Sequence, residues 1–140
     1  DNDQVIRAMT LAREWGVTAV GWRLSRRFLL DRKEREKVEQ ALSGLARVGR
    51  VEDGECFDVG DLNDEGRVLW TWPERDALRD LWNHLTTVRN ELDHAGMNPG
   101  PMKAAKLVRK AQEDVWPRLE ELARIWGLAT YPPPPFPGEG

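Results

Sequence analysis

Apolar residues recur at three- and four-residue steps along much of this chain, the spacing that gathers them on one face of an α-helix. The longest regular stripe consists of Leu78, Leu81, Trp82, Leu85, Val88 and Leu92. Pro73 and Glu74 precede it and suit a first helical turn. Proline is tolerated there because the backbone N–H groups of that turn have no partner within the helix, and glutamate is favoured because its negative charge faces the positive end of the helix dipole. Gly96 and Pro99 follow the stripe and break the pattern. We therefore predict a helix from Pro73 to His94.

Two segments before residue 50 show the same spacing. The apolar residues between Val5 and Trp15 predict a helix that ends near Gly16. From residue 17 to residue 48 apolar side chains fall on one side and charged side chains on the other. This second pattern predicts either one long helix or two helices with a break near residues 30–31.

The last stripe runs from Met102 to Trp126, and Gly127 suits the position just past its C-terminus. Pro117 lies inside this stripe, so we expect it to bend the predicted helix. Residues 131–137 are mostly proline and favour an extended polyproline II conformation.

The segment 50–73 differs from the helical stretches around it. Glycines punctuate it, and residues 50–76 hold nine acidic side chains against three basic ones. We interpret 50–73 as an irregular acidic insertion. The overall charge of -3 therefore comes mostly from this segment. It does not argue against a surface for nucleic acid on the other parts of the molecule.

Together these patterns predict an all-α fold, a bundle of four to five helices over residues 1–131 with the acidic insertion and a proline-rich tail at 132–140. Seven tryptophans are expected to supply much of the core, with Trp82, Trp116 and Trp126 on helical apolar faces. No apolar run reaches the roughly 18 residues of a membrane span. The lone Cys56 favours a reducing cytoplasm, and it offers too few partners for a zinc site. Because the chain starts Asp1-Asn2-Asp3 without methionine, we expect a fragment or an isolated domain.

Candidate chemistry lies at the end of the most regular helix, in the string Arg89-Asn90-Glu91-Leu92-Asp93-His94. An arginine holds a phosphate bidentately, and an imidazole moves protons near neutral pH. This pair suffices in principle for RNA cleavage without a metal or another cofactor. A histidine near a helix C-terminus also stabilises the helix dipole, so a structural role for His94 stays open.

The Arg-polar-x3-His spacing resembles the signature of the HEPN ribonucleases. The continuation His94-Ala95-Gly96-Met97 with Pro99 is similar to HEPN domains of CRISPR-associated ribonucleases, which follow a CARF domain that senses cyclic oligoadenylate. The resemblance implies an HEPN-like bundle and attack of an RNA 2′-hydroxyl on its own phosphate, which leaves 2′,3′-cyclic phosphate ends. It also implies single-stranded RNA as substrate, with Arg89, Asn90 and His94 as catalytic residues. No CARF domain is evident within this chain.

The resemblance further implies a homodimer in which two motifs line one cleft. Residues five apart on an ideal helix lie about 140 degrees around its axis, so Arg89 and His94 do not converge tightly. Either the helix loosens before Gly96, or two copies build one site. Asp93 is placed to pair with Arg89 at i,i+4, which is an alternative structural role for both.

Basic residues Lys103, Lys106, Arg109 and Lys110 follow the motif at helical spacing. We interpret Lys103, Lys106 and Arg109 as candidate contacts to the RNA backbone, against the alternative of an ordinary solvated face. The leading prediction is a metal-independent endoribonuclease, the effector of a CRISPR-associated antiviral defence protein. The competing one is a catalytically silent HEPN-type module for dimerisation or for a toxin–antitoxin pair.

Overall fold

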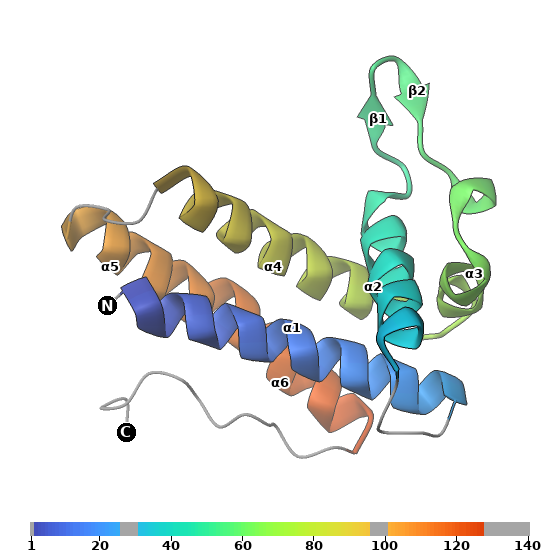
Figure 1. Ribbon diagram of the computed structural model, residues 1–140, viewed down its shortest axis with the longest axis horizontal. Coiled ribbons are helices and arrows are strands. Elements are labelled where there is room, and N and C mark those ends of the chain that lie inside the picture. The colour runs from blue at the N-terminus through green and yellow to red at the C-terminus, as the bar shows by residue number, and fades with distance from the viewer. Residues whose placement is uncertain (1, 26–30, 96–100, 128–140) are drawn as a thin grey trace. The chain divides into compact units, whose positions relative to one another are not determined.

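The computed structural model describes residues 2–25, 31–95 and 101–127. The elements in chain order are α1 (Asn2–Ser25), α2 (Arg32–Arg47), β1 (Val51–Glu52), β2 (Glu55–Cys56), the 3₁₀ turn η1 (Val59–Asp61), α3 (Asp64–Trp70), α4 (Arg75–Ala95), α5 (Pro101–Lys110), the π-helical segment η2 (Ala111–Val115) and α6 (Trp116–Ile125). Helices dominate the described residues, and the two short strands form one antiparallel hairpin (Figure 1). The prediction of an all-α protein is confirmed.

The chain divides into two compact units. The central unit is Gly16–Trp82, and the terminal unit combines Asp1–Trp15 with Asn83–Gly140. Helices α1 and α4 each contribute one half to each unit. The assignment of residues 1–131 to one helical domain, with a proline-rich tail at 132–140, stays a prediction.

Helix α1 continues through Gly16, so the prediction that it ends there is wrong. Gly16 is buried, and a Cβ placed on it would lie 3.1 Å from Cζ3 of Trp82. The glycine is therefore explained by the close approach of an indole ring. A helix tolerates this residue because tertiary packing outweighs the modest cost of glycine in a helix interior.

Of the two alternatives for residues 17–48, one long helix or two helices with a break near residues 30–31, the structure has the second, since α2 is a separate helix that begins at Arg32. The Asp31 side chain accepts a hydrogen bond from the Glu34 N–H at 2.8 Å, and the Glu34 carboxylate accepts one from the Asp31 N–H at 3.1 Å. This reciprocal capping box satisfies two N–H groups that a helix start otherwise leaves unpaired. It fixes the N-terminus of α2.

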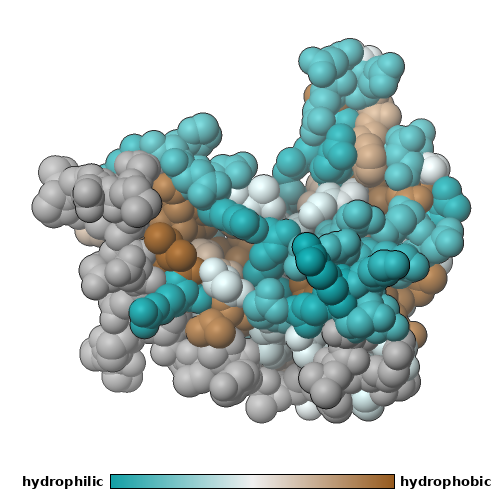
Figure 2. Space-filling view, viewed as in Figure 1, coloured by the Kyte–Doolittle hydropathy of each residue, from teal (hydrophilic) through white to brown (hydrophobic). Residues whose placement is uncertain are grey.

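The acidic insertion is not irregular, which corrects the prediction for 50–73. Its first part is the hairpin β1–β2, whose turn residues Asp53 and Gly54 have φ of 52° and 80°. Two successive positive φ values identify a type I′ turn, for which Asp-Gly is a favoured pair. Its second part is η1 and α3, with the Asn63 side chain accepting a hydrogen bond from the Gly66 N–H as N-cap. On the face seen in Figure 2 the tip of the hairpin is hydrophilic.

Helix α4 begins at Arg75, two residues after the predicted start, and Glu74 precedes it. Its apolar stripe is buried along its whole length, as predicted: Leu78, Leu81, Trp82, Leu85, Val88 and Leu92. The residues expected to end this helix, 96–100, and the tail 131–140 lie outside the described residues. Trp82 and Trp116 are buried, whereas Trp126 is only half-buried, so two of the three expected core tryptophans are confirmed.

A π-helical segment interrupts the last predicted helix just before Pro117. This segment is η2, and α6 begins at Trp116. A proline has no N–H and clashes with the carbonyl four residues earlier, here that of Glu113, and η2 contains that residue. The glycine predicted to close this helix, Gly127, has φ of 67° and donates a hydrogen bond to the Arg124 carbonyl.

Candidate functional site

The candidate motif lies on the half of α4 that belongs to the terminal unit. Leu85, Val88 and Leu92 are buried there. Because these three residues define the inward face of a regular helix, the residues between them must point elsewhere. Arg89, Asn90, Asp93 and His94 are all exposed. The burial of one stripe thus presents the candidate catalytic side chains to solvent.

The four exposed side chains are not engaged with their neighbours. Within residues 2–25, 31–95 and 101–127, no hydrogen bond or ion pair involves the side chain of Arg89, Asn90, Asp93 or His94. The i,i+4 pair of Arg89 with Asp93, one of the structural alternatives, is therefore not formed. Among the described residues, none of these four groups is held by an intramolecular partner.

The backbone of α4 is α-helical as far as Ala95. The helix therefore does not loosen between Arg89 and His94, and the first of the two ways to bring them together is not realised. With about 100 degrees per residue, Arg89 lies on one flank of the buried stripe and His94 points away from it. One copy of α4 places the guanidinium and the imidazole on different faces.

Glu91 has a partner that the sequence did not reveal. Its Oε1 lies 2.5 Å from Nζ of Lys110, and both side chains are about one-third exposed, 34% and 30%. The contact joins α4 to the last residue of α5. The two residues are 19 positions apart on different helices, so no local spacing rule links them.

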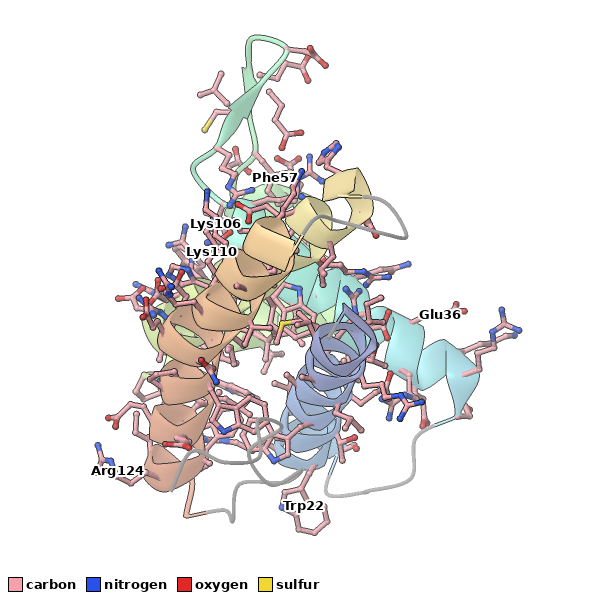
Figure 3. The ribbon with its side chains drawn as sticks, turned by 90° about the vertical axis from the view of Figure 1, so that its left-hand side faces the viewer. Trp22, Glu36, Phe57, Lys106, Lys110 and Arg124 are labelled. Atoms are coloured by element: carbon pink, nitrogen blue, oxygen red, sulfur yellow. The ribbon has the colours of Figure 1, made fainter. Side chains whose placement is uncertain are left out.

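The predicted RNA-binding residues Lys103, Lys106 and Arg109 are exposed on α5. Lys110, the fourth member of that basic run, is half-buried and held by Glu91. Figure 3 shows Lys106 and Lys110 on the same side of α5. The structure thus brings together one acid of the motif and one end of the basic run, and it leaves three cations open to solvent.

His94 occupies the last turn of α4. A cationic imidazole is favourable at that end of a helix dipole, so the structural role considered for this histidine is compatible with its place. No hydrogen bond from its side chain to a carbonyl of the described residues accompanies that position.

A cavity of about 340 Å³ lies in the central unit among α1, α2 and α3. Leu24, Val38 and Val68 line it, with carboxylates of Glu34, Asp64 and Glu65 around them. It contains none of the predicted site residues. No group of three metal-binding side chains and no helix long and apolar enough to cross a membrane occurs in the described ranges.

Comparison with known proteins found no matching family model, no matching curated protein and no matching solved structure.

Proposed function

We propose that this chain is a metal-independent HEPN-type endoribonuclease domain that cuts single-stranded RNA. The observation that carries the proposal is the presentation of the whole Arg89-Asn90-x3-His94 string on a regular helix. All three side chains are exposed and unpaired among the described residues, while the apolar stripe beneath them is buried. Exposed cations without an intramolecular partner are what a phosphate-binding surface requires.

In the proposed reaction the RNA 2′-oxygen forms a bond to the adjacent phosphorus while the bond from phosphorus to the 5′-oxygen breaks. A proton leaves the 2′-hydroxyl and another is delivered to the 5′-oxygen, which gives a 2′,3′-cyclic phosphate and a 5′-hydroxyl. His94 moves protons, since imidazole is the side chain that most often serves as general acid or base in proteins. DNA is inert because it has no 2′-hydroxyl.

Arg89 stabilises the negative charge that grows on the phosphoryl oxygens. Its guanidinium offers several donors in a planar fork that matches two phosphate oxygens at once. Asn90 orients a phosphate oxygen or the imidazole through its amide. Neither residue has another hydrogen-bonding task among the described residues.

The working site is a composite of two copies of α4 in a homodimer. The regular helix separates Arg89 and His94 by about 140 degrees around its axis, so an arginine from one copy and a histidine from the other are needed in one cleft. Two motifs in one cleft also supply two imidazoles, one to accept a proton and one to donate a proton.

The physiological setting that we propose is a CRISPR-associated antiviral defence protein of the cytoplasm. Its activity would be controlled by a CARF sensor domain that binds cyclic oligoadenylate and lies outside this chain. This setting rests on the resemblance of residues 89–99 alone.

The test is cleavage of a 5′-labelled single-stranded RNA in excess chelator, with analysis of the product ends. We expect cyclic phosphate ends from the wild type and a loss of about 10²- to 10⁴-fold in rate for His94→Ala. The matched control is Arg32→Ala, which removes an arginine with a 92% exposed side chain from α2 and should leave the rate unchanged. Products with 3′-hydroxyl ends, or equal rates for wild type and His94→Ala, would contradict the proposal.

Mixing two inactive variants tests the composite site. A dimer of one Arg89→Ala chain and one His94→Ala chain retains one intact arginine and one intact histidine on different copies. If the two copies share a cleft, the mixture regains part of the activity, because the cleft then holds one arginine and one imidazole. If each copy works alone, the mixture stays inactive, and an intact dimer that never cuts favours the catalytically silent module.

A further inference from the structure

We propose that the ion pair between Glu91 and Lys110 is a positioning contact for this cleavage, and this inference rests on the proposed function. The pair fixes how far α5 is shifted along α4, and it withdraws Lys110 from the row of cations that meets RNA. Glu91 therefore acts through the placement of other residues and does not touch the substrate.

The contact is well suited to fix two helices. It joins Oε1 of Glu91 in α4 to Nζ of Lys110 in α5 at 2.5 Å, and each side chain keeps only about a third of its surface exposed, 34% and 30%. The pair of Glu121 with Arg124, within α6, is far more open at 52% and 71%. Partial burial reduces screening by water and salt, so the first pair holds its geometry more firmly than the second.

The pair sets which residues of α4 lie beside which residues of α5, that is, at the same level along the two helix axes. Helix α4 ends at Ala95 and α5 begins at Pro101, and the two run in opposite directions (Figure 1). His94 is three residues beyond Glu91, and Lys106 is four residues before Lys110. With a rise of about 1.5 Å per residue, these offsets are about 4.5 and 6 Å in the same direction. Lys106 thus lies close to the level of His94.

Lys110 belongs by spacing to the same row as Lys103 and Lys106. Residues at steps of three and four share one face of a helix. Lys103 and Lys106 are exposed, whereas Lys110 is half-buried against Glu91. The carboxylate therefore removes one of three aligned ammonium groups from phosphate binding, and Lys106, the one closest to the level of His94, stays exposed. RNA is held beside the imidazole and not one turn further along α5.

The substitution Glu91→Gln tests this arrangement, because it keeps the side-chain shape and removes the charge that holds Lys110. Binding is measured with 2′-O-methyl RNA, which cannot be cut. We expect tighter binding, with a slope of log K against log salt that is steeper by about 0.7, since one more cation meets a phosphate on a single strand. On cleavable RNA we expect kcat to fall by about 10- to 100-fold, since displacement of the strand by about an ångström costs that much.

Lys110→Gln breaks the same pair without freeing a cation. It should lower kcat as Glu91→Gln does and leave the salt slope at its wild-type value. The exchanged pair Glu91→Lys with Lys110→Glu should recover most of the wild-type kcat, because the contact is restored with its ends reversed. Glu121→Gln, which opens the exposed pair of α6, is the matched control and should change neither kcat nor the slope.

A merely structural contact would lower the melting temperature of both variants and leave the salt slope of Glu91→Gln unchanged. A wild type that cuts, together with a Glu91→Gln variant that keeps both the wild-type kcat and the wild-type slope, overturns the positioning role alone. A wild type that does not cut overturns the proposed function, so the two failures are distinct.

Discussion

Helix α4 carries basic side chains in both of its halves, and the two halves use them differently. In the half within the central unit, the Arg75 guanidinium lies 4.3 Å from the centre of the Trp70 ring and donates a hydrogen bond to the Trp70 carbonyl at 2.7 Å. Arg79 donates to the carbonyls of Leu45 and Val48, at 3.1 and 2.6 Å. Both arginines are half-buried and donate hydrogen bonds to backbone carbonyls.

In the half within the terminal unit, Arg89 and His94 are exposed and have no hydrogen bond or ion pair with the described residues. The difference lies in the surroundings, since the two halves have the same helical backbone. The C-terminus of α2 offers unpaired carbonyls and Trp70 offers an indole face to the first half. An arginine that finds such acceptors becomes a structural clamp, and one that finds none is available to an anionic ligand.

The largest effect that we expect comes from Arg89 in the terminal-unit half of α4, where a substitution should impair catalysis without impairing stability. Arg89→Ala should lower the rate of RNA cleavage by about 10²- to 10³-fold, because one donor to the developing phosphoryl charge is lost. Its free energy of unfolding should change by less than about 0.5 kcal/mol, because the side chain is exposed and unpaired. Cleavage assays and urea unfolding measure the two quantities. A large loss of stability would remove the distinction between the two halves.

The second prediction concerns the clamp in the first half. Arg79→Ala should lower the free energy of unfolding by about 3 kcal/mol, since two carbonyls at the end of α2 each lose a charged donor. Arg79→Lys should recover only part of this, because an ammonium cannot reach both acceptors with a planar fork. Urea unfolding of the three proteins provides the measurement. An Arg79→Ala variant as stable as the wild type would show that the carbonyls are equally well satisfied by water.

The third prediction sharpens the same contrast through packing. Gly16→Val should lower the free energy of unfolding by about 1 to 3 kcal/mol, because even a Cβ at this position meets the Trp82 ring at 3.1 Å. Thr10→Val, which places a valine at an exposed position of the same helix, is the control and should change stability little. Thermal unfolding followed by tryptophan fluorescence reports both variants. Equal melting temperatures for them would mean that Trp82 moves aside without cost.

The smallest effect is expected for a cation that is paired but exposed. A hydrogen bond from Arg124 holds the pKa of the Glu121 carboxyl below its ordinary value. Because folding lowers the pKa of this carboxyl, any stabilisation by the pair is fully present above the pKa that Glu121 has in the unfolded chain. It is lost as the pH falls through the lower pKa of the folded state. Arg124→Gln should raise the pKa of Glu121, as measured by NMR titration of its carboxyl carbon. An unchanged titration curve would show that solvent already screens this pair.

The sequence by itself determined the helical class and the most regular element. The stripe from Leu78 to Leu92 is buried as its spacing predicted, because a period close to that of the helix leaves one inward face whatever the rest of the chain does. It also indicated the turn at Gly127, and it offered a break near residues 30–31 as one of two alternatives; both features depend on residues next to each other in the chain. The exposure of Arg89 and His94 follows from the same stripe. The Asp53-Gly54 turn is equally local, because Asp-Gly is a favoured pair for a two-residue hairpin turn.

Only the tertiary structure decided which of these local features acts with a distant partner. Gly16 looked like a helix end, but it lies inside α1 because the Trp82 ring packs against it. Glu91 looked like a spacer within the motif, and it pairs with Lys110 on another helix. Such contacts join residues that are far apart in the chain, and spacing rules extend only over a turn or two of one helix. Local periodicity therefore fixes the elements and their inward faces, whereas the use of each remaining side chain depends on the neighbours that folding brings to it.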